Sequence, residues 1–198
     1  MKIKVCGVSD AEFAHAAARL GVDYLGFIFE PSSPRFVTVD AVAKIAAALS
    51  AAPRRVQLVG VFVSQTVGEI VSTMREAHLD VVQLHCRASQ EEVAALQAAG
   101  FEVWTLAGGA HGDGVLFDSS HGDGDKNFVR LSCKTILAGK IGADNLAETV
   151  ELGPDVIDVN SSLEASPGKK SIDLLNEFME AYARAVGSGD TQCARNLV

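Results

Sequence analysis

The sequence predicts a single-domain α/β protein whose eight parallel strands close into a (β/α)8 TIM barrel. The chain has 198 residues, of which 48% are hydrophobic and 21% charged, so it can bury one sizeable core. Short runs of Val, Ile, Leu and Phe alternate with alanine-rich stretches of helical spacing. Most of these runs are apolar at consecutive positions, which is typical of parallel strands covered by helices.

Eight apolar runs mark the predicted strands, and the stretches between them mark the helices. Ser9 and Asp10 follow the first run and are placed to cap a helix that ends near Leu20. Ser89 is placed to cap a later helix. The predicted strands span residues 3–8, 24–29, 56–63, 81–85, 102–107, 115–118, 135–139 and 156–161. The predicted helices span about 11–20, 40–50, 67–77, 90–99 and 172–186, with another opening at 142–145 and a frayed tail after about residue 187.

Two connections are too short to hold a full helix. Residues 108–114 alone join the fifth and sixth strands, and residues 119–134 must contain a glycine-rich loop as well as any helix. We therefore expect helices five and six to be shortened or missing, which also fits a length near the lower limit for this barrel. An open doubly wound sheet is the alternative, but residues 6–10 lack the glycine-rich fingerprint that commonly follows its first strand.

Polar side chains interrupt several predicted strands. Because successive side chains of a strand alternate between its faces, these polar residues are expected to point into the barrel, away from the apolar helix layer. Taken singly, each has an ordinary structural explanation, but several stand at the carboxyl ends of strands, where barrel enzymes carry their active sites. The inward-facing polar residues are Lys4 and Cys6 of the first strand, Gln83 and His85 of the fourth, Asp118 of the sixth and Asp158 of the eighth.

Two segments late in the chain have the composition of phosphate-binding loops. Gly139 and Lys140 follow the seventh strand, and Ser161 and Ser162 follow the eighth. In barrels these loops often bind phosphate through backbone N–H groups and a short helix N-terminus, and small residues permit the close approach. Arg35, after the second strand, could clamp a carboxylate with two hydrogen bonds or lie on the surface.

Composition and charge disfavour several classes of partner. Seventeen Lys and Arg against twenty-five Asp and Glu give a net charge of −8, which argues against nucleic-acid or anionic-membrane binding by bulk charge. Neither a signal peptide nor a membrane-spanning run is predicted, so we expect a soluble, cytoplasmic protein. The cysteines show no paired spacing and are expected to be reduced thiols, with neither disulfides nor a zinc site. They are Cys6, Cys86, Cys133 and Cys193.

These residues, in this order, resemble the phosphoribosylanthranilate isomerases, which are barrel enzymes of tryptophan biosynthesis. The resemblance covers residues 2 to about 180. Each motif is short, but their succession over the whole length is specific. The segments that carry the resemblance are 4–8, 25–29 with 33–35, 59–63, 81–85, 117–118, 136–139 and 158–164 with 167–168.

The resemblance implies an Amadori rearrangement of N-(5-phosphoribosyl)anthranilate to 1-(o-carboxyphenylamino)-1-deoxyribulose 5-phosphate. It implies that Asp118 is the general acid that opens the ribose ring and that Cys6 is the general base at sugar C2. Arg35 is implied to hold the anthranilate carboxylate. No metal or organic cofactor is implied, and we expect a monomer or a homodimer. The remaining implied roles are pocket lining for Gln83, His85 and Asp158, and phosphate binding for Gly139, Lys140, Ser161 and Ser162.

The sequence departs from the family pattern in the loops expected near the phosphate. The loop at 122–130 carries Asp123 and Asp125 where the family usually has Gly-Gly-(Thr/Ser)-Gly-Lys, and Lys140 follows Gly139 where a second glycine is usual. Two alternatives therefore stay open. One is another sugar-phosphate barrel isomerase or epimerase, which Cys6 disfavours because those relatives typically use paired aspartates or a metal. The other is a decayed, non-catalytic barrel that acts as a binding protein.

Overall fold

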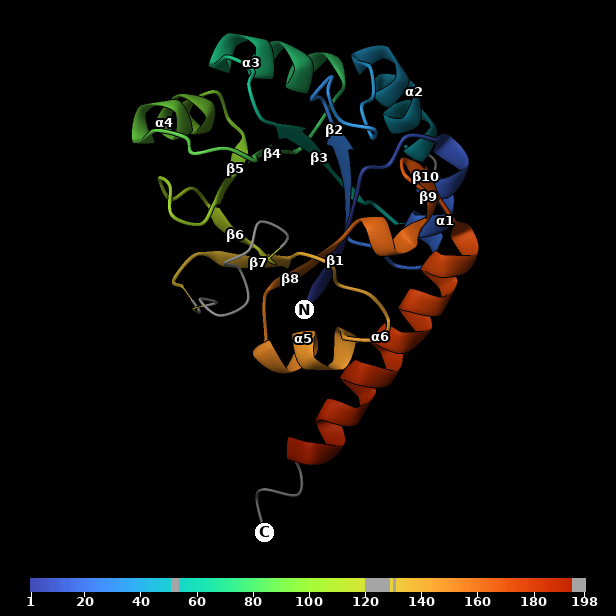
Figure 1. The fold of residues 1–198 in the computed structure, drawn as a ribbon. Coiled ribbons are helices and arrows are strands. Elements are labelled where there is room, and N and C mark those ends of the chain that lie inside the picture. The colour runs from blue at the N-terminus through green and yellow to red at the C-terminus, as the bar shows by residue number, and fades with distance from the viewer. Residues whose placement is uncertain (51–53, 120–128, 130, 194–198) are drawn as a thin grey trace.

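A computed structural model describes residues 1–50, 54–119, 129 and 131–193 of the chain. Eight parallel strands form a closed barrel in chain order, and the eighth pairs with the first to complete the ring. Helices lie outside the barrel over much of its circumference, and the last of them projects beyond it towards the C-terminus (Figure 1). The fold class predicted from the sequence is confirmed.

Strands and helices alternate along most of the chain. The strands of the barrel are β1 Lys2–Cys6, β2 Tyr24–Ile28, β3 Gln57–Phe62, β4 Val81–Leu84, β5 Glu102–Leu106, β6 Gly114–Asp118, β7 Lys134–Ala138 and β8 Val156–Val159. The helices are α1 Ala11–Arg19, α2 Val39–Leu49, α3 Val67–Glu76, α4 Gln90–Ala98, α5 Leu146–Leu152 and α6 Ile172–Cys193. Between β8 and α6 lie a 3-10 helix, Ser161–Leu163, and an antiparallel hairpin of β9 Glu164–Ser166 and β10 Lys169–Lys170.

Side-chain caps fix where the helices begin. Asp10 accepts a hydrogen bond from the Phe13 N–H at 2.7 Å and starts α1. Ser89 and Glu92 form a reciprocal capping box at the start of α4. Each cap satisfies a backbone donor that the first helical turn leaves unpaired, which stabilises the helix by about 1 kcal/mol. The caps predicted at Asp10 and Ser89 are confirmed, whereas Ser9, predicted with Asp10, precedes the N-cap position of α1.

Two helix boundaries differ from the sequence prediction. The helix expected to open at 142–145 begins at Leu146, because Asn145 instead holds the preceding loop by accepting the Gly142 N–H at 2.8 Å. The last helix continues to Cys193 rather than ending near residue 186. Single glycines lower helix propensity by only about 1 kcal/mol each, so they do not end a helix by themselves. The last part of the tail predicted to fray, residues 194–198, lies outside the described residues.

No helix connects β5 to β6, since the described residues 107–113 form turns, bends and irregular backbone. The prediction that the fifth helix of the barrel is shortened or missing is therefore confirmed. The prediction for helix six falls on the β6–β7 connection, most of which lies outside the described residues.

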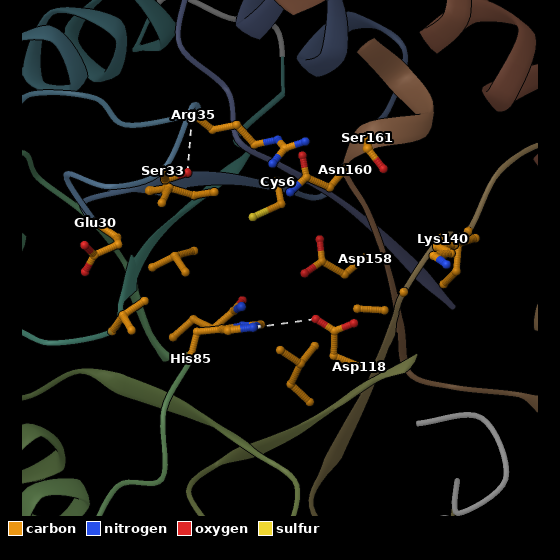
Figure 2. A pocket seen from close by; sticks show the side chains of 18 residues that line it. Cys6, Glu30, Ser33, Arg35, His85, Asp118, Lys140, Asp158, Asn160 and Ser161 are labelled. Carbon is orange, nitrogen blue, oxygen red and sulfur yellow. Dashed lines mark hydrogen bonds and ion pairs between the residues drawn. The ribbon is translucent and has the colours of Figure 1, made fainter. Parts of the chain in front are cut away.

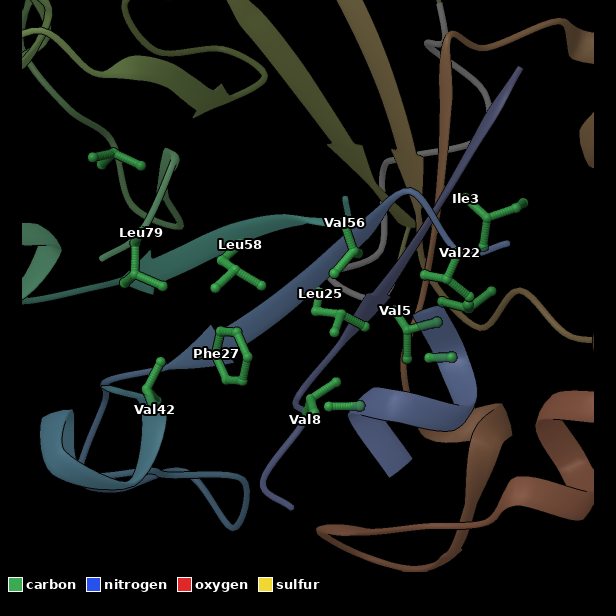
Figure 3. Packing of buried hydrophobic residues seen from close by; sticks show 14 of the residues in the cluster. Ile3, Val5, Val8, Val22, Leu25, Phe27, Val42, Val56, Leu58 and Leu79 are labelled. Carbon is green, nitrogen blue, oxygen red and sulfur yellow. The ribbon is translucent and has the colours of Figure 1, made fainter. Parts of the chain in front are cut away.

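The hydrophobic core has two parts, which the barrel wall separates. The larger part lies between the outward faces of the strands and the helices, and Figure 3 shows Val5, Leu25 and Phe27 within it. Each aliphatic side chain buried there contributes about 1.5–3 kcal/mol to folding. The smaller part fills the barrel interior and consists of Tyr24, Val59, Val81, Trp104, Leu116, Ile136, Ala138 and Val156.

An aromatic and ionic cluster fills the N-terminal end of the barrel. Trp104 and Tyr24 meet edge to face with ring centroids 5.0 Å apart, and both are fully buried. Glu102 accepts hydrogen bonds from Trp104 Nε1 and from Lys134 Nζ, which lies 5.2 Å from the Trp104 ring centroid. These contacts pair the polar groups at this end, which we call the floor of the barrel, and side chains fill it. The opposite end is therefore the one at which a ligand can enter the interior.

Gly114, at the start of β6, packs against this floor. A Cβ at Gly114 would lie 2.8 Å from Trp104 Cδ1 and 2.8 Å from Ile136 Cδ1. We expect Gly114→Ala to lower the free energy of unfolding by about 1–3 kcal/mol, because overpacking strains a filled core. Urea denaturation measures this change. Gly68→Ala in α3 is the matched control, since nothing lies within 4 Å of its added Cβ. Equal stability of Gly114→Ala and the wild type would contradict this packing.

Candidate active site

A cavity of about 330 Å³ opens at the C-terminal ends of the strands, opposite the floor (Figure 2). Its volume is within the range of small-molecule pockets. The structure brings together all the site residues predicted from the sequence except Ser162, which does not line the cavity. The Ser162 hydroxyl donates to the Ile141 carbonyl at 2.5 Å. The predicted residues that line the cavity are Cys6, Arg35, Gln83, His85, Asp118, Gly139, Lys140, Asp158 and Ser161.

Cys6 and Asp118 lie on different sides of the cavity and both point into it (Figure 2). Cys6 is the last residue of β1 and Asp118 the last residue of β6, so neighbouring strands hold both in place. Nε2 of His85, which follows β4, lies 3.6 Å from Oδ2 of Asp118. A thiol and a carboxyl group on two sides of one cavity can act on two different atoms of a single ligand.

The protonation of Cys6 depends mainly on its burial. Burial raises the pKa of the Cys6 thiol above its ordinary value, and Asp158 raises it further. Lys4 and Lys170 oppose these effects without cancelling them. The protonated thiol is therefore the main form at neutral pH, and the thiolate, once formed, is a correspondingly strong base.

A buried ion pair lies on the inner wall of the barrel between β1 and β8. Lys4 Nζ lies 2.7 Å from Asp158 Oδ2, and the two residues face each other in the strand register. Burial raises the pKa of Asp158, and the positive charge of Lys4 opposes that rise. Within the described structure, Asp158 Oδ1 is buried and has no hydrogen-bond partner. Because Asp158 lines the cavity, a hydroxyl group of a ligand could satisfy this oxygen.

Arg35 is held by an acid of its own chain. Its Nε and Nη2 donate to the two carboxylate oxygens of Glu164 at 2.7 and 2.9 Å, which is bidentate geometry. The fully buried ammonium group of Lys170 donates to Glu164 at 3.0 Å and to the carbonyl and side-chain oxygens of Asn160. Burial raises the pKa of Glu164, but the hydrogen bonds from Arg35 and Lys170 outweigh it and hold that pKa below its ordinary value. Arg35 is thus oriented before any ligand binds.

The loop after β7 presents a cation to the cavity. Gly139 and Lys140 have positive φ values of 109° and 51°, and for a lysine this left-handed conformation costs about 1–2 kcal/mol. Asn145 stabilises the loop by donating to the Lys140 carbonyl at 3.0 Å. Lys140 and Ser161 line the same cavity from the loops after β7 and β8, where the sequence analysis expects a phosphate site.

The described ranges contain neither a metal-binding cluster nor a membrane-spanning helix. No group of three or more His, Cys, Asp or Glu side chains there is arranged to hold a metal ion. Over the same ranges, no helix has both the length and the apolar character needed to cross a membrane.

Residues 3–181 match the family described as N-(5'phosphoribosyl)anthranilate (PRA) isomerase. The chain belongs to the PRA isomerase family. A curated N-(5'-phosphoribosyl)anthranilate isomerase from Campylobacter jejuni is 32% identical over an alignment of 197 positions, gaps included, that spans 91% of this chain and 98% of that relative. The family predicted from the sequence is confirmed, and the protein is an isomerase of tryptophan biosynthesis.

Solved PRA isomerase structures have the same fold. The enzyme from Thermus thermophilus superposes with a TM-score of 0.81 at 30% identity, covering 93% of this chain and 99% of its own. A second PRA isomerase superposes with a TM-score of 0.76 at 26% identity, covering 92% and 98%. That second structure is a complex with reduced 1-(o-carboxyphenylamino)-1-deoxyribulose 5-phosphate.

Several residues of this PRA isomerase site were not predicted from the sequence. Glu164, Lys170 and Asn160 form the network that orients Arg35, and Glu30 lines the cavity beside β2. Glu164 ends the segment 158–164 that carries the family resemblance, and Lys170 lies two residues after the segment 167–168. These positions were the signal by which the sequence could have indicated them. Neither lies on a barrel strand, so alternation of side chains could not predict where they point.

Glu164 provides a test of this network. We expect Glu164→Gln to lower the free energy of unfolding at pH 7 by about 2–4 kcal/mol, because it leaves the buried Lys170 without its ion-pair partner. A carboxyl group with a lowered pKa stabilises the fold above its unfolded pKa and loses that effect as the pH falls through its folded value. The difference from the wild type should therefore shrink below about pH 4.

Denaturation at several pH values measures this dependence. Glu180→Gln in α6 is the control, because its pair with Arg184 is about three-quarters exposed and should contribute less than about 0.5 kcal/mol. If Glu164→Gln lowered the free energy of unfolding by the same amount at every pH, the charge of the Glu164 carboxylate would not contribute to stability.

Proposed function

We propose that this chain converts N-(5'-phosphoribosyl)anthranilate to 1-(o-carboxyphenylamino)-1-deoxyribulose 5-phosphate by an Amadori rearrangement. The observation that carries the proposal is the pairing of Cys6 and Asp118 across one cavity that also presents Arg35 and Lys140. The substrate has a carboxylate at one end and a phosphate at the other, so a cavity with two separate cations suits it. The analogue in complex with a related PRA isomerase carries the same two anionic groups.

Ring opening is the first step of the proposed mechanism. Asp118, protonated, gives its proton to the ribose ring oxygen. The bond between that oxygen and C1 breaks while the nitrogen lone pair forms a C1=N double bond, so the product is a protonated Schiff base. Nε2 of His85 lies 3.6 Å from Oδ2 of Asp118, so the imidazole is placed to help orient this carboxyl group.

Proton removal from sugar C2 is the second step. The Cys6 thiolate takes this proton, and the electron pair of the C–H bond forms a C1=C2 double bond as the C1=N bond becomes single. The resulting enolamine gains a proton at C1 and loses one from the C2 hydroxyl, which gives the ketone. Substrate and product are isomers, so the reaction consumes no other reactant.

Groups around the cavity are suited to hold the substrate in position between Cys6 and Asp118. Nη1 of Arg35 is left over from the clamp on Glu164 and can donate to the anthranilate carboxylate. Asp158 Oδ1 can accept a hydrogen bond from a sugar hydroxyl, and Gln83 lines the same cavity from β4. Lys140, with Ser161 and the backbone of Gly139, is suited to the phosphate. Ser162 would contribute only through its backbone, because its hydroxyl is engaged elsewhere.

We also propose that residues 1–198 form one domain that works in the cytoplasm on this small molecule, as a monomer or homodimer. The net charge of −8 supports a protein without nucleic-acid or anionic-membrane partners. Sedimentation or light scattering would decide between the two oligomeric states.

Substitution of the acid and the base tests the mechanism. We expect Cys6→Ser and Asp118→Asn each to lower kcat by about two to four orders of magnitude, since general acid–base catalysis contributes on that scale. Loss of the anthranilate-type fluorescence of the substrate measures turnover. Cys86→Ser is the matched control, because this thiol does not line the cavity and its loss should leave kcat unchanged.

Turnover at the wild-type rate in either variant would refute the role of that residue. A wild-type protein that binds the reduced product analogue without turning over substrate would instead support a non-catalytic barrel.

Lys140 allows phosphate binding to be separated from backbone strain. We expect Lys140→Gly and Lys140→Ala each to raise KM about tenfold with little change in kcat, because both remove the cation. Only glycine relieves the positive φ, so the glycine variant should be more stable than the alanine variant by about 1 kcal/mol. Steady-state kinetics and thermal unfolding measure the two effects. An unchanged KM in both variants would remove Lys140 from the phosphate site.

A further inference from the structure

Lys4 is a fully buried cation that the proposed reaction steps do not use. Its side chain has no solvent exposure, it does not line the cavity, and its ion-pair partner is Asp158. Burying such a pair costs several kcal/mol per ion, and apolar replacement of buried pairs is often neutral or stabilising. Stability of the fold therefore does not explain the lysine at this position of β1.

The ammonium group of Lys4 lies beside the Cys6 thiol. The two residues are separated by one position on β1, so both side chains point into the barrel. Gly26 of β2 faces Cys6 in the strand register, and a Cβ there would lie 3.0 Å from Cys6 Sγ and 3.0 Å from Lys4 Nζ. The sulfur and the nitrogen thus border the same small space, which a glycine leaves open. This proximity is within the range over which an opposite charge shifts a pKa.

Other charged groups of the described structure also face Cys6. Asp158 faces it from β8, Lys170 from β10, and Arg35 from the loop after β2. Lys170 and Arg35 both donate to Glu164, which offsets part of their charge. Asp118 and His85 face Asp158 from the far side of the cavity.

Among these groups, Lys4 has the largest effect in lowering the pKa of the Cys6 thiol, larger than the opposing effect of Asp158. Burial lowers the pKa of Lys4 itself, but Asp158 and Cys6 outweigh that and raise it above its ordinary value. Lys4 therefore stays positively charged over the pH range in which a thiol titrates.

We infer that Lys4 is a positioning residue of the reaction: its ammonium group stabilises the Cys6 thiolate, and Asp158 holds that ammonium group beside the sulfur. The inference rests on the proposed role of Cys6 as general base. Lys4 acts on the substrate only through Cys6 and Asp158, because the lysine itself does not line the cavity. This role explains the buried ion pair of Lys4 and Asp158, which stability of the fold does not explain.

The test measures the reactivity of Cys6 without substrate. Iodoacetamide alkylates the thiolate, so the alkylation rate of Cys6 is followed by mass spectrometry from about pH 7 to 11. The rise of the rate with pH gives the midpoint of thiol ionisation, or a lower limit for it where the rate still rises at about pH 11. We expect Lys4→Met to raise that midpoint by about one to three pH units and to lower the rate near neutral pH by about tenfold or more. The value of kcat/KM should fall in parallel and recover in part as the pH is raised.

A second variant covers the case in which Lys4→Met fails to fold. That substitution leaves Asp158 buried without its partner, whereas Lys4→Met/Asp158→Asn removes both charges together. The midpoint should rise in the double variant too, because Lys4 affects the thiol more than Asp158 does. Lys44→Met, at an exposed position of α2, is the matched control and should leave the midpoint unchanged.

The outcomes separate this inference from the proposed function. A wild-type midpoint in a folded Lys4 variant overturns the inference, even if Cys6→Ser is inactive. Full turnover by Cys6→Ser overturns the proposed role of Cys6 instead, whatever the alkylation rates show.

Discussion

Closure of the barrel between β1 and β8 is the constraint on which the site depends. It brings Lys4 and Asp158, 154 positions apart in the chain, to a contact of 2.7 Å in the barrel interior. Because all eight strands are parallel, their carboxyl ends share one rim, and residues from distant parts of the sequence meet there. The same closure seals the opposite end with aromatic rings. The candidate active site is therefore at the C-terminal end of the barrel.

Charged groups in the barrel and at its rim are paired locally. Lys4 is paired with Asp158, and Glu164 lies between the cations Arg35 and Lys170. Each group is held by strands or by the β9–β10 hairpin before any ligand arrives, so little reorganisation is required on binding. Preorganised charges of this kind stabilise a developing charge more strongly in a buried site than water does, because solvent dipoles would have to reorient in every turnover.

Periodicity along single strands predicted much of this structure, and contacts between distant segments account for the rest. Alternation on β1, β4, β6 and β8 was enough to indicate that Cys6, His85, Asp118 and Asp158 share the interior. The partner of Arg35 could not be predicted in this way, because Glu164 lies 129 positions away in a strand of three residues with no readable pattern. The left-handed backbone at Lys140 was equally hidden, since a lysine gives no local signal for positive φ.

The floor of the barrel has a practical consequence. The chain contains a single tryptophan, and the fold places it in the floor, against Tyr24 and under the positive charge of Lys134. Its intrinsic emission will therefore respond to loss of barrel closure, while a bound anthranilate ring would sit at the other end of the cylinder. Folding and ligand binding could thus be followed by two separate fluorophores, the tryptophan for the closed barrel and the anthranilate ring for the bound ligand.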